Sequence, residues 1–127
     1  MLVTASLAAI DSGDIFLVQN EEGFWTLPGG KKELGETERL ALTRELSQEL
    51  ARANCTIGSF WNKVESVTPT SKQAVEVHVF LGSISGDVSP TAEVKASGWF
   101  SPQQLEQFKI SPPTREILDK LISEGRL

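Results

Sequence analysis

The sequence predicts an α/β protein in which a mixed β-sheet lies between helices. Strand-like segments stand before and after one long segment with helical periodicity, and further helical segments close the chain. At 127 residues the chain has the size of one ordinary domain. We therefore expect residues 1–127 to form a single domain.

The first part of the chain predicts a β-hairpin. Residues 2–10 and 14–20 are short apolar-rich runs typical of strands, and the Asp-Ser-Gly-Asp segment between them favours a tight turn. Further on, Pro28 restricts the backbone, while the glycine pair at 29–30 permits conformations closed to other residues. A sharp turn is expected there.

The next segment predicts the clearest helix in the chain. It has neither glycine nor proline from Thr37, a residue type that favours the N-cap, to about Arg52. Apolar residues recur in it at helical spacing at Leu42, Leu46, Leu50 and Ala53. We expect a helix from Thr37 to about Arg52.

The remaining segments predict two long strands, a short strand and two helices. Residues 56–68 and 73–85 have strand rhythm, and a polar loop joins them. A second loop leads to a short strand at 97–100, after which Ser101 with Pro102 and Gln104 predicts a capped helix start. An amphipathic helix over 112–127 closes the chain.

Composition excludes several classes of protein. A net charge of −5 and an isoelectric point near 4.9 argue against binding to a nucleic-acid polymer, and a phosphate-bearing ligand would need a cation bridge. The single cysteine, Cys55, cannot form an intramolecular disulfide, which fits a reducing compartment. No leader-like or membrane-length apolar segment is present, so we expect a cytoplasmic protein without membrane contact.

Glu45 and Glu49 are one helical turn apart, on a face that adjoins the leucines. Like charges at this spacing are destabilising unless something compensates them. A divalent cation such as Mg²⁺ or Mn²⁺, which prefers carboxylate oxygens, would do so. The alternative from the helix alone is a solvated face on which Arg44 and Arg52 balance the acids.

The spacing around these glutamates resembles the Nudix box, G-x5-E-x7-R-E-U-x-E-E-x-G-U, where U is a bulky aliphatic residue. The chain matches the box at Gly30, Glu36, Arg44, Glu45, Leu46 and Glu49, after a Leu-Pro-Gly-Gly lead-in. It departs from the box at Gln48, Ala51 and Arg52, where the pattern has Glu, Gly and an aliphatic residue. We expect Ala51 only to prolong the helix.

The resemblance to the Nudix hydrolase family, and to its small MutT-like members, implies a fold and an activity. The fold would be an α/β/α sandwich with a mixed sheet between helices. The activity would be Mg²⁺-dependent hydrolysis of a diphosphate linkage, with Mn²⁺ as an alternative metal, in nucleoside triphosphates or related nucleotides. An enzyme for a non-nucleotide diphosphate stays open, as does a homodimer.

The resemblance also implies site residues. The metal ligands would be the Gly30 carbonyl, Glu45, Gln48 and Glu49. Glu45 would also activate water, and Arg44 would orient a box glutamate with Glu36 as its partner. In some members the base is a loop glutamate, for which Glu93 is the candidate here; a solvated loop charge is the other interpretation.

Gln48 raises an alternative function. An amide can offer a metal one neutral oxygen, but it lacks the charge that strengthens a hard-cation site. We expect weaker binding of one metal. The alternative to an efficient enzyme is a nucleotide-binding or regulatory protein on the same fold, with catalysis impaired by Gln48.

Two residues are candidates for substrate binding. Trp25 could stack on a base, although a large aromatic residue more often fills a core. In MutT-like proteins the residue just beyond the Pro-Pro pair, here Thr114, falls where an amide side chain reads guanine. A threonine offers only a hydroxyl there, and it could instead be a helix N-cap.

Overall fold

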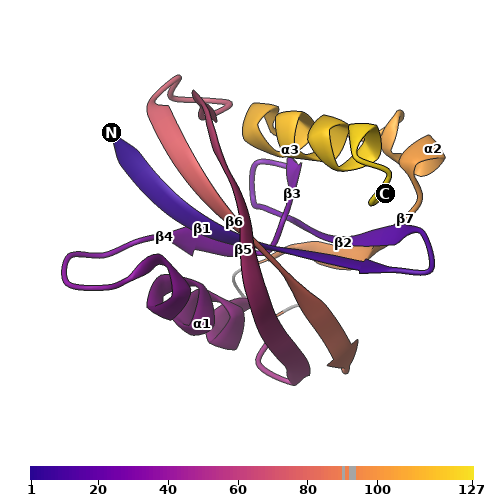
Figure 1. Cartoon of the computed structure of the whole chain (residues 1–127), viewed down its shortest axis with the longest axis horizontal. Coiled ribbons are helices and arrows are strands. Elements are labelled where there is room, and N and C mark those ends of the chain that lie inside the picture. The colour runs from indigo at the N-terminus through magenta and orange to yellow at the C-terminus, as the bar shows by residue number, and fades with distance from the viewer. Residues whose placement is uncertain (90, 92–93) are drawn as a thin grey trace.

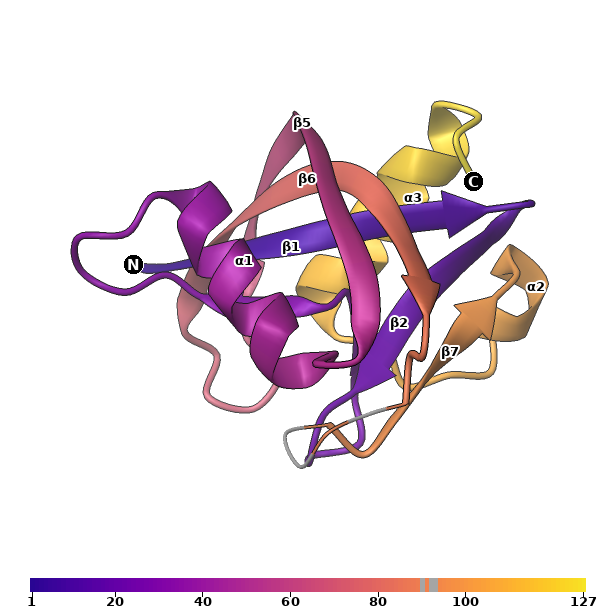
Figure 2. The same cartoon turned by 90° about the horizontal axis from the view of Figure 1, so that it is seen from below.

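A mixed β-sheet lies between α1 on one face and α2 and α3 on the other, as Figures 1 and 2 show from two directions. This computed structural model describes residues 1–89, 91 and 94–127. In chain order the elements are β1 (Leu2–Asp11), β2 (Asp14–Gln19), β3 (Trp25–Thr26), β4 (Gly29–Lys31), α1 (Glu38–Glu49), β5 (Ala53–Val67), β6 (Ala74–Gly86), β7 (Ala96–Phe100), α2 (Pro102–Leu105) and α3 (Pro112–Ser123). The predicted α/β/α fold class is confirmed.

Strand β1 joins the parts of the sheet. Residues 2–9 of β1 run parallel to residues 75–82 of β6, and residues 4–6 also pair antiparallel with β4 on the other edge. The end of β1 pairs with β2 through a tight turn in which Ser12 and Gly13 have φ values of 53° and 84°. Positive φ at both central residues is the type I′ geometry that suits a hairpin, so the predicted hairpin is confirmed.

Alternating side chains build a core on each face of the sheet. The core under α1 includes Ala5, Leu7, Ala9, Phe16, Leu42, Leu46 and Phe80. The core under α3 includes Ala8, Ile15, Leu17, Val75, Val77, Val79, Ile117 and Leu118. The valines at positions 75, 77 and 79 of β6 therefore share the face of the sheet that α3 covers.

Helix α1 begins where the sequence predicts but ends earlier. The Thr37 hydroxyl accepts a hydrogen bond from the Leu40 N–H at 3.1 Å, the expected N-cap contact. The helix ends at Glu49, and Leu50 has the non-helical angles φ −131° and ψ 57°. The expected extension to Arg52 is wrong because β5 starts at Ala53, and its pairing with β6 overrides the helix propensity of Ala51.

The glycine pair forms strand β4 rather than a sharp turn. Gly29 and Gly30 pair with Ser6 and Ala5 of β1. A Cβ atom on Gly29, whose φ is 141°, would lie 2.1 Å from the Ala5 carbonyl oxygen. The chain does bend, but at Pro28 between β3 and β4, while the two glycines permit a close strand pairing.

The later elements follow the sequence closely. Ser101 and Gln104 form a capping box at the start of α2, and α3 begins at Pro112. No helix in the described part of the chain is long and apolar enough to cross a membrane.

Candidate functional site

Glu45 of α1 lies against the backbone of Gly30. A Cβ atom on Gly30 would lie 2.5 Å from the Glu45 carboxylate carbon and 2.7 Å from its Oε2. Any larger residue at position 30 would therefore displace the carboxylate. The Glu45 side chain is 16% exposed, so it is mostly enclosed but still reaches solvent.

Glu49 meets the same strand one helical turn later. The Gly29 N–H donates a hydrogen bond to Glu49 Oε1 at 2.8 Å. Residues four apart on a helix lie one above the other on the same face, so both carboxylates point toward β4. The structure thus brings Glu45, Glu49 and the glycine pair together, as the sequence predicts.

Arg44 connects Glu36 to Glu45. Its Nε and Nη2 donate to the two carboxylate oxygens of Glu36 at 2.8 and 2.9 Å, and its Nη1 donates to Glu45 Oε1 at 2.9 Å. A further bond from Nη2 reaches the Lys31 carbonyl at 2.9 Å. The predicted contact between Arg44 and Glu36 is confirmed, in the two-pronged geometry that arginine favours.

These contacts shift the ionisation of both partners. The Arg44 hydrogen bonds, followed by the N–H of Glu33, lower the pKa of Glu36 to about 2. The hydrogen bonds to Glu36 and then to Glu45 raise the pKa of Arg44. Arg44 therefore stays charged and fixes the orientation of Glu45 next to Gly30.

Two predicted site residues are less well defined by the structure. Gln48 is exposed on the last turn of α1, where its backbone carbonyl accepts a hydrogen bond from the Thr91 hydroxyl at 2.7 Å. Its predicted part in metal binding stays a prediction. Glu93 lies outside the residues that the structure describes.

The donor atoms near Gly30 suit a hard divalent cation. No three His, Cys, Asp or Glu side chains among the described residues are grouped closely enough to hold a metal ion. The available set is instead two carboxylates beside a strand backbone. Such oxygen atoms fit Mg²⁺ or Mn²⁺, which commonly completes its shell with water and substrate phosphates.

A cavity of about 430 Å³ opens beside the glycine pair on the α3 side of the sheet. Its lining includes Gly29, Gly30, Thr4, Ser6, Asn20, Glu22, Thr26, Gln73, Val75, Val77, Ser111 and Thr114. Among the described lining residues Glu22 is the one charged side chain, and the other polar ones are hydroxyls and amides. The glycine pair therefore borders the cavity and the carboxylate site together.

Thr114 lies in the wall of this cavity. Its hydroxyl accepts a hydrogen bond from the Ser111 hydroxyl at 2.8 Å, and both residues are 4% exposed. Ser111, not Thr114, is the N-cap of α3. The N-cap interpretation of Thr114 is wrong because the helix starts at Pro112, which places Thr114 inside the first turn.

Trp25 is not brought to the cavity. Its ring stacks on Phe108 with centroids 5.3 Å apart and meets the edge of Phe100 at 5.0 Å. These contacts belong to the core under α3. The structure favours the core interpretation, and base stacking by Trp25 stays a prediction.

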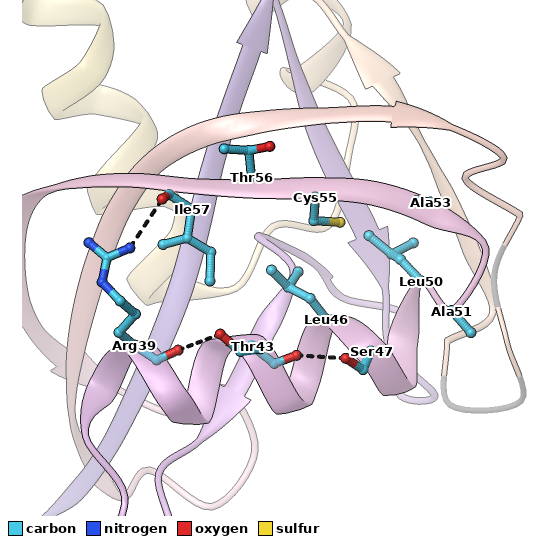
Figure 3. A pocket seen from close by; sticks show the side chains of 10 residues that line it. All are labelled: Arg39, Thr43, Leu46, Ser47, Leu50, Ala51, Ala53, Cys55, Thr56 and Ile57. Atoms are coloured by element: carbon cyan, nitrogen blue, oxygen red, sulfur yellow. Dashed lines mark hydrogen bonds between the residues drawn. The ribbon is translucent and has the colours of Figure 1, made fainter.

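A second cavity of about 500 Å³ lies between α1 and β5 (Figure 3). Its floor is apolar, with Leu46 and Leu50, and Arg39 closes one end through a hydrogen bond to the Ile57 carbonyl at 3.1 Å. Neither Glu45 nor Glu49 lines it. We therefore place the candidate site at the glycine pair and not in the larger cavity.

Some residues near the site carry no signal in the sequence. The Thr70 hydroxyl donates to Glu22 Oε2 at 2.5 Å, which links two chain segments at the cavity. Thr91 bonds the end of α1. These residues come from loops whose approach depends on tertiary contacts, so no spacing rule could have found them.

The NUDIX domain family model matches residues 1–121, and the chain belongs to this family. A Mycobacterium tuberculosis protein named "Putative 8-oxo-dGTP diphosphatase 2" is 68% identical over 97 residues, 73% of this chain and 64% of that protein. The chain thus spans less than two thirds of that relative. The Escherichia coli "CTP pyrophosphohydrolase" is 27% identical over 116 residues, 87% of this chain and 84% of that protein. The crystal structure of a MutT NUDIX hydrolase from Burkholderia pseudomallei superposes with a TM-score of 0.79 at 26% identity, covering 94% of this chain and 97% of that chain.

Proposed function

We propose that the protein is a Mg²⁺-dependent pyrophosphohydrolase of nucleoside triphosphates or related nucleotides. One observation carries the proposal: the strand Gly29–Lys31 has the Glu45 and Glu49 carboxylates against it and also borders the 430 Å³ cavity. A nucleotide with its nucleoside in the cavity would extend its phosphates toward the carboxylates. The family supports hydrolysis as the chemistry.

The distribution of charge supports a nucleotide whose nucleoside lies in the cavity and whose phosphates lie near the carboxylates. The described lining of the cavity contains no lysine or arginine, so it suits a neutral base and sugar better than a phosphate chain. The carboxylates repel phosphates unless a cation lies between them. Glu45, Glu49, the Gly30 carbonyl and the Gln48 amide oxygen would hold this cation. When bound, it neutralises phosphate charge and acidifies water.

The chain's own residues would supply positioning and a base. Arg44 keeps one oxygen of Glu45 bonded and fixes its carboxylate against Gly30. Glu45 would then accept a proton from the attacking water, with Glu93 as the alternative base. Because Gly30 has no side chain, the Glu45 carboxylate can lie directly against its backbone.

The proposal names a class of substrate and does not select one nucleobase. The relatives' names include one purine and one pyrimidine nucleotide, 8-oxo-dGTP and CTP. At Thr114 the wall offers hydroxyl groups, which both donate and accept hydrogen bonds. Such a wall tolerates several bases, so we propose nucleoside triphosphates as the substrate class.

The test is turnover of a substrate panel with Mg²⁺ or Mn²⁺. The panel contains the common nucleoside triphosphates, 8-oxo-dGTP, ADP-ribose, dinucleoside polyphosphates and nucleotide sugars. We expect metal-dependent hydrolysis of a triphosphate that Glu49→Gln abolishes. The matched control is Glu116→Gln, which removes the same charge from an exposed position on α3 and should leave turnover unchanged.

Gln48→Glu decides between an enzyme and a binding protein. Its control is Gln103→Glu, the same change at an exposed position of α2. If the native protein is active, Gln48→Glu should lower the metal concentration needed for half-maximal activity. Activity that appears only in Gln48→Glu would overturn the proposal in favour of a nucleotide-binding protein with impaired catalysis.

A further inference from the structure

The last turn of α1 is held from a distant part of the chain. Thr91, which stands 43 residues after Gln48, donates its hydroxyl to the Gln48 carbonyl at 2.7 Å. Its backbone N–H donates to the Glu49 carbonyl at 3.4 Å. The last carbonyls of a helix have no partner within the helix, so Thr91 satisfies groups that would otherwise face water.

The C-terminal end of α1 has few capping groups within its own sequence, so its last carbonyls depend on Thr91. Position 51 carries alanine, where glycine could adopt the left-handed conformation that commonly closes a helix. The last turn of α1 contains no basic residue to bond its carbonyls. The Leu50 N–H bonds the Leu46 carbonyl, and beyond it the chain turns directly into β5.

Glu49 is consequently fixed at two points. Its side chain accepts the Gly29 N–H, and its backbone accepts the Thr91 N–H. Thr91 is itself anchored, since its carbonyl accepts the Val94 N–H at 3.3 Å and Val94 is buried in the core under α1. The Lys95 N–H then bonds the Gln19 carbonyl at 2.9 Å, which ties the same segment to β2. The segment that contacts the last turn of α1 is therefore itself bonded to the sheet.

We propose that Thr91 is a positioning residue whose hydroxyl fixes the last turn of α1, so that Glu49 presents its carboxylate to the metal ion. This inference rests on the proposed function, because it requires that Glu49 bind the metal. Loss of the hydroxyl frees the Gln48 carbonyl and lets the turn fray. Glu49 then has to be ordered when the metal binds, which weakens metal affinity.

The experiment measures Mn²⁺ binding directly, by electron paramagnetic resonance of the free ion, without nucleotide or turnover. Thr91→Val keeps the shape of the side chain and removes the hydroxyl, whereas Thr91→Ser keeps the hydroxyl. We expect Thr91→Val to weaken Mn²⁺ binding by about 3- to 10-fold, the range for loss of one hydrogen bond. Thr91→Ser should bind as the native protein does.

The control is Thr43→Val, which removes a hydroxyl that donates to the Arg39 carbonyl within the same helix. It should leave Mn²⁺ binding unchanged. Native-like affinity in Thr91→Val, even with a lowered melting temperature, would overturn the positioning role while the proposed metal site stands. No Mn²⁺ binding by the native protein would overturn the metal site, and the inference with it.

Discussion

Replacement of Gly30 by alanine tests the geometry of the site most directly. The added Cβ would lie 2.5 Å from the Glu45 carboxylate carbon, whereas ordinary van der Waals contact begins at 3.4 Å. The carboxylate must therefore move by about 0.9 Å. A displacement of about 1 Å in a catalytic group can cost on the order of 10²-fold in rate. We expect kcat to fall by about this factor, with a raised metal requirement.

The assay is kcat for the best nucleotide at saturating and limiting Mg²⁺, together with urea unfolding. Because Glu45 reaches solvent, it can move aside, and we expect little change in the free energy of unfolding. Gly13→Ala is the control for a change in stability alone. Gly13 has φ 84° and nothing within 4 Å of an added Cβ, so alanine there should cost about 1 kcal/mol of stability and leave kcat unchanged. A Gly30→Ala variant with native kcat and native metal requirement would refute the reasoning.

Two further predictions concern stability. The pKa of Glu36 is lowered to about 2 from 4.5, so its ion pair with Arg44 stabilises the fold above pH 4.5 and the contribution is lost as pH falls toward 2. Urea unfolding of Glu36→Gln should therefore differ from the native protein at pH 7 and converge with it near pH 2 to 3; an equal difference at every pH would contradict this. Leu42 is the fully buried leucine on the sheet-facing side of α1, so Leu42→Ala should lower the free energy of unfolding by about 2–5 kcal/mol. Leu40→Ala, at a position that is 57% exposed on the same helix, should change it by less than about 0.5 kcal/mol, and equal losses in both would show that the burial argument fails.

The start of α1 and the positions of the two long strands could be predicted because their signals are local. Thr37 and the leucines of α1 mark a helix start and an apolar stripe within a few residues of one another. Along β6, valines alternate with other residues at the two-residue period of a strand. Patterns of this kind persist whatever the rest of the chain does.

The end of α1 and the state of the glycine pair could not be predicted, because remote partners decide them. Ala51 favours a helix, yet the pairing of Ala53 with Gly86 of β6 takes the chain away from α1. The glycine pair resembles a turn, yet β1 accepts it as a strand. In both places a tertiary contact outweighs the local preference.

The candidate site likewise has one part that local sequence spacing predicts and another that depends on contacts between distant segments. The box spacing predicted that Glu45, Glu49 and Arg44 would lie together, since all three share one helix. The cavity could not be predicted, because its walls come from β1, the segment after β5 and the start of α3. The fixed end of α1 was also hidden, since the Thr91 contact spans 43 residues.

The pairing of β4 with β1 also bears on how tolerant the site is to folding errors. Side chains alternate along a strand, so a slip by one residue would turn Gly30 away from Glu45. In one direction the slip would bring Lys31 opposite Ala5, where Gly30 belongs, and in the other it would bring Pro28, which has no N–H, opposite Ser6. The residues that flank the two glycines thus favour a single register of β4 against β1. A chain paired in another register could still form the sheet, but Gly30 would no longer lie against Glu45.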